Sequence, residues 1–310
     1  MKLDEVVKLL GLRSVEELLA LGYRTVEAIA FTSPSTLAKD LGVSLEAAER
    51  CVKAAVESLS VKPVSLEELM RKQLDVERIH TGSRALDKLL GGGIESCMVT
   101  EFYGEYGAGK TQICHQLSVN AQLPKSMGGL SSKVAYIDPD GTFRPERVVR
   151  MSIELGLDPK ATLNNILYFK PTNTYQQALA ARKAVEEGVK LLIIDSVVSL
   201  FRIDGGMATG YRGLTQHLRM LRDLALSNRL AIVITNQAVA RPELGVEVAP
   251  AGGFSVETSL TRVRLEKRVG GVRVAKLENS PYLAEGEALF KITEGGIRDV
   301  FKEEGYDYAE

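Results

Sequence analysis

The sequence is poor in cysteine and has no long apolar run. Its three cysteines, Cys51, Cys97 and Cys114, are scattered and odd in number. They fit neither a disulfide framework nor a zinc site, and they are typical of a protein in a reducing interior. No stretch approaches the roughly 18 apolar residues of a membrane span, and the start has no signal-peptide pattern. We therefore expect a cytoplasmic protein that has no membrane partner.

An excess of positive charge is also missing. The chain has 39 basic and 40 acidic residues, which gives a net charge of -1. Any binding to a polyanion must therefore come from local patches or from an assembly. The 310 residues are 45% hydrophobic and 25% charged, which is ordinary for a globular protein with one large and one small domain.

One stretch carries a specific phosphate-binding pattern. Residues 104–111 read GEYGAGKT and fit G-x-x-x-x-G-K-[ST]. An apolar run from Met98 to Tyr103 predicts a strand before the pattern, and Thr111 opens a predicted helix. The alternative is a glycine-rich turn with a chance lysine. The predicted triphosphate-binding residues are Gly104, Glu105, Tyr106, Gly107, Ala108, Gly109, Lys110 and Thr111. Lys110 should reach the β and γ phosphates, and Thr111 should ligate Mg²⁺.

Strands and helices alternate after this pattern. The predicted strands are 98–103, 133–138, 166–170, 191–195 and 231–235, and the predicted helices include 145–155, 175–187 and 214–228. This order predicts an α/β fold with a mainly parallel sheet, helices on both faces and a ligand beyond the carboxyl ends of the strands. Period-two strands joined at Gly270-Gly271 follow, with the cations Arg262, Arg264 and Arg273 expected on a solvated face.

Two carboxylates are candidates for metal binding and catalysis. Asp195 ends a buried strand, where it can hold Mg²⁺ opposite Thr111, although a strand-end cap is the alternative. Asp140 follows another strand and can orient or deprotonate the attacking water. Asp138 could serve that role instead, or lie behind the metal ligands. We leave the two aspartates as alternatives.

The first part of the chain predicts a separate domain. Helical spacing of apolar residues over 1–60 indicates a bundle of short helices. Residues 61–76 are charged and form a predicted linker with one or two helical turns. The ATPase domain should then occupy residues 77–310.

Residues 81–124, from "TGSRALDKLLGGG" through the phosphate-binding pattern, resemble the RadA/RecA recombinase family of the archaeal type. The first 60 residues resemble the helix-hairpin-helix domain of that family, with Gly42-Val43-Ser44 at one hairpin. The resemblance implies a RecA-like ATPase core, ATP and Mg²⁺ as cofactors, single- and double-stranded DNA as partners, and a role in recombination and repair.

The resemblance also implies further site residues. Arg147 stands where the family stacks on adenine, and Gln237 stands where it senses the γ phosphate. Asp140 stands where the family has Glu, so we expect a slow, DNA-dependent ATPase. Two mobile loops, about 202–213 and 238–253, should contact DNA. Their expected contacts are Arg202, Arg212, Arg241, Gly252 and Gly253.

Some positions depart from the family pattern. The Phe-x-x-Ala segment that links subunits into filaments is replaced, with Pro63 and Leu66 at its two places. Asn279 and Ala284 replace an Asp and a Pro in the segment that caps the ATP of the neighbouring subunit. The leading hypothesis is a recombinase that binds ATP-Mg and DNA and promotes homologous pairing and strand exchange, either by self-assembly or with a recombinase partner. The alternatives are a paralog that binds the true recombinase and modulates its filament, and a regulatory ATPase that does not act on DNA.

Overall fold

The computed structural model describes residues 2–59, 64–74, 76–204, 206–241, 246–250 and 260–300. Contacts divide the chain into two compact units, Met1–Gln73 and Leu74–Glu310. The division falls inside the linker predicted for residues 61–76. No helix in the described ranges is long and apolar enough to cross a membrane.

The first unit consists of short helices around an apolar core of its own. Its helices are α1 (Leu3–Leu10), α2 (Val15–Ala20), α3 (Val26–Ala30), α4 (Pro34–Leu41) and α5 (Leu45–Ser58), followed by α6 (Leu66–Leu74). Ser33 and Ser44 cap α4 and α5 by accepting backbone hydrogen bonds. Gly42 ends α4 with a φ of 66°, a conformation that suits glycine. The segment is therefore a bundle of short helices in which Gly42-Val43-Ser44 joins α4 to α5.

Ten strands of the described chain form one sheet in the second unit. Its order is β12-β11-β10-β9-β3-β7-β6-β4-β5, and β8 pairs with β7. The strands are β3 (Met98–Gly104), β4 (Val134–Ile137), β5 (Ile166–Phe169), β6 (Leu191–Ile194), β7 (Ala231–Arg241), β8 (Val246–Pro250), β9 (Thr261–Lys267), β10 (Val272–Asn279), β11 (Gly286–Thr293) and β12 (Gly296–Asp299). Pairing is parallel from β9 to β5, and β10, β11 and β12 add antiparallel pairs. Two short strands, β1 (Arg78–Ile79) and β2 (Ile94–Glu95), form a separate ladder.

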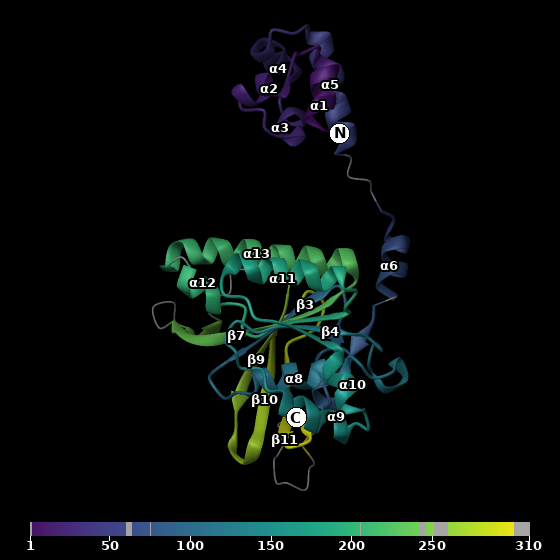
Figure 1. Ribbon diagram of the computed structural model, residues 1–310, viewed down its shortest axis with the longest axis vertical. Helices are drawn as coiled ribbons and strands as arrows, with labels where there is room; N and C mark the ends of the chain where they lie inside the picture. The colour runs from purple at the N-terminus through teal and green to yellow at the C-terminus, as the bar shows by residue number, and fades with distance from the viewer. Residues whose placement is uncertain are drawn as a thin grey trace. The chain divides into compact units, whose positions relative to one another are not determined.

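Helices cover both faces of this sheet. The helices are α7 (Arg84–Leu89), α8 (Lys110–Asn120), α9 (Pro145–Glu154), α10 (Pro159–Asn164), α11 (Thr174–Glu186), α12 (Ser199–Asp204) and α13 (Gly206–Asn228), with short 3-10 turns η1 (Lys125–Met127) and η3 (Val269–Gly271). Figure 1 shows α11, α12 and α13 on one face and α8, α9 and α10 on the other. Each face has its own apolar cluster, so β4 and β6 are buried along their whole length. The predicted α/β fold is confirmed.

The two predicted loops are instead largely regular structure. Residues 206–213 belong to α13, which begins eight residues before the predicted helix start, and residues 202–204 end α12. An established helix adds further turns at little cost, which outweighs the low propensity of its glycines. Residues 238–241 continue β7, and 246–250 form β8, which pairs with it. The prediction of open loops over these residues was therefore wrong.

Candidate functional site

The carboxyl ends of β3, β4 and β6 and the middle of β7 meet beside the amino terminus of α8. The turn from β3 into α8 is the predicted phosphate-binding stretch, and α8 begins at Lys110. Gly107 and Gly109 have φ values of 77° and 109°, which glycine adopts without strain. A Cβ on Gly109 would lie 2.6 Å from Ile292 Cδ1. The turn therefore needs glycine both for its backbone and for its close packing, as a phosphate cradle does.

Lys110 lies across this turn. Its Nζ donates hydrogen bonds of 2.8 Å to the carbonyl oxygens of Gly104 and Glu105. Burial lowers the pKa of Lys110, while the nearby Asp195 carboxylate acts in the opposite direction. The ammonium group is therefore held at the turn by neutral carbonyls, where it can exchange them for phosphate oxygens.

Asp195 is the buried carboxylate directly after β6. It accepts hydrogen bonds from Thr235 Oγ1 at 2.5 Å and from Tyr136 OH at 2.9 Å. Burial raises its pKa, and the hydroxyls of Thr235, Thr111 and Tyr136 act in the opposite direction. An Asp carboxylate beside the Thr111 hydroxyl offers oxygen ligands, which are the ligands that Mg²⁺ prefers. The residues present therefore fit a magnesium ion.

Asp140 and Asp138 have different environments. Asp138 is fully buried, and its carboxylate accepts the backbone N–H groups of Thr142 and Phe143 at 3.0 and 2.8 Å. It shapes the turn after β4. Asp140 lines the cleft, where Ser199 Oγ donates to its Oδ2 at 2.8 Å and Ser196 Oγ donates at 3.2 Å. Of the two alternatives, Asp140 is the one that faces the cleft.

Gln237, which lies within β7 opposite Gly104 of β3, is held from two sides. Its Oε1 accepts a hydrogen bond of 2.7 Å from Arg202 Nη1, and its backbone N–H donates to Asn236 Oδ1 at 2.8 Å. Arg202 is at the same time the one predicted DNA contact whose side chain is described. The side chains of Arg212 and Arg241, and all of Gly252 and Gly253, lie outside the described residues.

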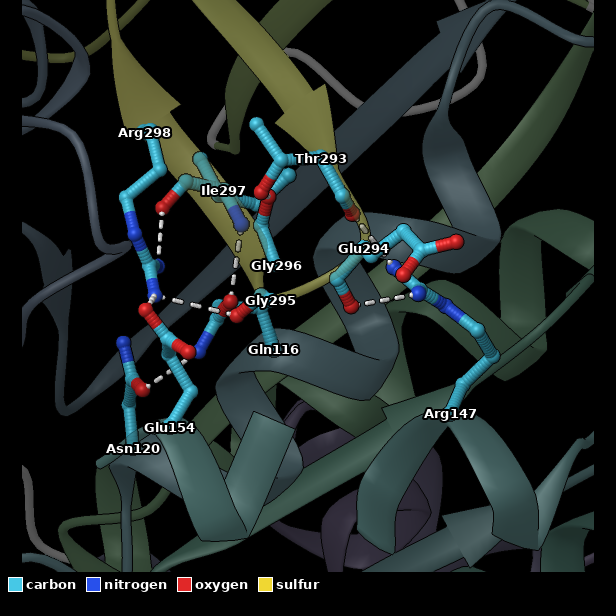
Figure 2. A network of polar contacts seen from close by, with 10 residues as sticks. All are labelled: Gln116, Asn120, Arg147, Glu154, Thr293, Glu294, Gly295, Gly296, Ile297 and Arg298. Carbon is cyan, nitrogen blue, oxygen red and sulfur yellow. Dashed lines mark hydrogen bonds and ion pairs between the residues drawn. The ribbon is translucent and has the colours of Figure 1, made fainter. Parts of the chain in front are cut away.

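Arg147 connects α9 to the turn between β11 and β12. Its guanidinium donates to the carbonyls of Glu294 and Thr293 at 2.7 and 3.0 Å, and to Gln112 Oε1 at 2.9 Å. Figure 2 shows the hydrogen bonds from Arg147 to Glu294 and Thr293. It also shows a second contact to the same turn, in which Gln116 accepts the Ile297 N–H at 2.8 Å. Arg147 is not among the cleft-lining residues, whereas its partner Gln112 is. Hydrogen bonds to a guanidinium lie near its plane, so these three bonds do not themselves occupy the faces that stacking would use.

One cleft of about 770 Å³ contains the glycine-rich turn together with Lys110, Asp140, Asp195 and Gln237. Its lining residues are Gly104, Glu105, Tyr106, Gly107, Gly109, Lys110, Thr111, Gln112, Asp140, Thr142, Arg144, Asp195, Ser196, Thr235, Gln237, Ala238, Arg273 and Ile292. Of the predicted phosphate-binding residues, Ala108 alone is outside this set, because its methyl group is buried in the core. The cleft thus combines a glycine-rich turn, the Lys110 cation, the Asp195 carboxylate beside the Thr111 hydroxyl, and a second carboxylate, Asp140.

Comparisons with known proteins agree with this geometry. A family model described as Rad51 matches residues 71–300. The chain belongs to the Rad51 family. It is 40% identical over 302 residues to the "DNA repair and recombination protein RadA" of Metallosphaera sedula, an alignment that covers 94% of this chain and 93% of the relative. The protein of the same name from Aeropyrum pernix is 40% identical over 300 residues, with 93% and 94% covered.

The structure of this Rad51-family protein corrects the prediction that Arg262 and Arg273 lie on a solvated face. Arg262 is buried, with a side chain only 4% exposed, and its Nε donates to Glu101 Oε2 at 2.6 Å. Glu101 also accepts a hydrogen bond from Asn236 Nδ2 at 2.8 Å. The alternation of apolar and charged residues along a strand predicts which residues share a face of the sheet, but it does not predict whether other elements cover that face. The partner of Arg262, Glu101, lies on the adjacent strand β3, which is distant in the sequence.

Arg273 is a cleft residue that the sequence reasoning missed. It lies on β10, and its Nη2 donates to the carbonyl of Gly107 at 3.2 Å. The alternation of apolar residues correctly places it opposite Val272 and Val274. The sequence signal that was available is its position two residues after Gly270-Gly271, a turn that brings the start of β10 back to the sheet.

Proposed function

We propose that this protein binds ATP and Mg²⁺ in the cleft, binds single- and double-stranded DNA, and promotes homologous pairing and strand exchange in DNA repair and recombination. The observation that carries the proposal is the convergence of Lys110, Thr111, Asp195 and Asp140 on one cleft. Relatives that match over nearly the whole chain are named for DNA repair and recombination. This similarity favours a recombinase over a paralog that only modulates one.

In this proposal, the cleft residues and Arg147, which is bonded to the cleft residue Gln112, each have a distinct task toward the nucleotide. The backbone N–H groups of the turn and Lys110 bind the phosphates, Thr111 and Asp195 hold Mg²⁺, and Arg147 stacks on the adenine. Bound Mg²⁺ supplies positive charge to phosphate oxygens. Asp140 orients the attacking water, and its short side chain makes hydrolysis slow because positioning dominates phosphoryl transfer.

The contact between Gln237 and Arg202 offers a route from the cleft to DNA. Gln237 lines the cleft, while Arg202 belongs to the segment proposed to bind DNA. A γ phosphate accepts hydrogen bonds, so Gln237 would engage it through the amide Nε2. Turning the amide toward the phosphate moves Oε1 away from Arg202 Nη1, which is 2.7 Å from it here, and frees that guanidinium for a DNA phosphate. The predicted contacts at Arg212, Arg241, Gly252 and Gly253 remain part of this proposal.

Filament imaging and strand exchange test the function. Wild type and Lys110→Ala are compared by electron microscopy on single-stranded DNA with ATP and Mg²⁺, and by exchange of a labelled strand. Lys160→Ala, an exposed lysine on α10, is the matched control. We expect filaments and exchange for wild type and the control, and neither for Lys110→Ala. ATP binding without filaments or exchange by the wild type would refute the recombinase proposal in favour of a modulator.

A further inference from the structure

Arg273 is a half-buried cation without a counter-charge in the described chain. Two other cations on β9 and β10 pair with a carboxylate: Arg264 and Lys276 contact Glu266 at 3.2 and 3.3 Å. The hydrogen bonds of Arg273 within the described residues go instead to two carbonyl oxygens, those of Gly107 and Val272. A guanidinium that is partly removed from water favours an anionic partner.

The surroundings of Arg273 place it at the phosphate cradle. A Cβ on Gly109 would lie 3.6 Å from Arg273 Nε, and Ile292 packs over the same glycine. The Nε atom is buried and has no hydrogen-bond acceptor among the described residues. Burial also lowers the pKa of Arg273. The side chain therefore lies over the turn with part of its donor capacity unused, inside the cleft that Lys110 also lines.

We infer that Arg273 is a second phosphate-binding cation, which donates hydrogen bonds to the phosphate chain of a bound nucleoside di- or triphosphate. The inference rests on the proposed function of the cleft and adds one residue to it. A guanidinium suits this position because its fork lets one N–H remain on the Gly107 carbonyl while others reach phosphate oxygens. Lys110 and Arg273 then bind the phosphates from two different elements, α8 and β10.

Nucleotide binding by the full chain tests this role. The probes are fluorescent analogues of ATP and ADP, with unlabelled adenosine measured by calorimetry. Arg273→Gln keeps an amide N–H that can donate to the Gly107 carbonyl but removes the charge, and Arg273→Lys keeps the charge. Lys276→Gln, on the same strand but outside the cleft, is the matched control.

We expect Arg273→Gln to weaken ATP and ADP binding by about tenfold or more, since a hydrogen bond to a charged group is lost. Adenosine binding should not change, and Arg273→Lys should restore most of the affinity. The salt dependence of ATP binding should also become weaker for Arg273→Gln.

Two other results would be decisive. If wild type binds ATP and Arg273→Gln binds it equally well, Arg273 only braces the carbonyl of Gly107 and the inference is wrong. If wild type does not bind ATP, the proposed function itself fails, which is a different result.

Discussion

The ion pair between Arg262 and Glu101 gives the sharpest stability prediction. Both side chains are at most 4% exposed, and they lie on the adjacent strands β9 and β3 in the middle of the sheet. Arg262→Leu leaves the Glu101 carboxylate buried with a hydrogen bond from Asn236. Removing one partner of a buried pair costs about 3–5 kcal/mol, because the remaining charge has no compensation.

This cost can be measured as a shift in melting temperature. For a domain of 150–250 residues, 1 kcal/mol corresponds to about 2–4 °C, so we expect a fall of about 6–20 °C in the transition of the second unit. Scanning calorimetry resolves this transition from that of the first unit. The double variant Glu101→Leu/Arg262→Leu should recover much of the loss, since an apolar pair of similar volume is often neutral or stabilising.

A surface pair provides the control. Arg50 and Glu46 are 2.7 Å apart on α5, with side chains 60% and 81% exposed, so Arg50→Leu should change stability by less than about 1 kcal/mol. If Arg262→Leu alone costs no more than this control, burial does not determine the energetics of the pair and the reasoning is refuted.

Three further predictions concern the cleft and pH. Asp140→Asn should lower ATP turnover by about 100-fold or more in a phosphate-release assay while leaving ATP affinity nearly unchanged, and unchanged turnover would exclude Asp140 as the base. Gly109→Ala should reduce both thermal stability and ATP binding, because Gly109 has a φ of 109° and an added Cβ would clash with Ile292. Gly156→Ala is the control: an added Cβ there would have no heavy atom within 4 Å, so this variant should lose stability only. Burial lowers the pKa of His217 to about 4, so below about pH 6.5 the unfolded chain binds more protons than the folded chain. Stability that is complete above pH 6.5 should therefore fall by about 3 kcal/mol as the pH drops to 4, and His217→Leu should remove this part of the acid loss in calorimetry at several pH values.

The parts of the site that depend on local sequence could be predicted. The spacing of glycines and lysine in residues 104–111 requires a strand before it and a helix after it, and both are present. Asp195 follows an apolar run that only a buried strand can use, so its position at the carboxyl edge also follows from the sequence. These features depend on a few consecutive residues and on the period of the apolar pattern.

Features that depend on contacts distant in the sequence could not be predicted. Arg262 and Arg273 alternate with apolar residues, a pattern that is typical of an exposed face. In the folded chain, Arg262 instead contacts Glu101 on β3. Arg273 contacts the carbonyl of Gly107 in the turn before α8. Asp138 and Asp140 are two residues apart and chemically identical. The backbone N–H groups of Thr142 and Phe143 in the following turn select Asp138 for a structural role, and this selection requires the folded path of residues 139–143.

The hydrogen bonds from two serines to Asp140 affect the geometry of hydrolysis. Ser196 and Ser199 both donate to Oδ2, and Oδ1 accepts no hydrogen bond from the described residues. A water molecule recruited by this carboxylate would therefore meet Oδ1, and its line of approach would be fixed by two hydroxyl groups that never touch it. In the proposed function, Ser199 at the start of α12 and Ser196 just before it thus set the direction of attack. A change in their rotamers would redirect the nucleophile without altering any group that binds the nucleotide.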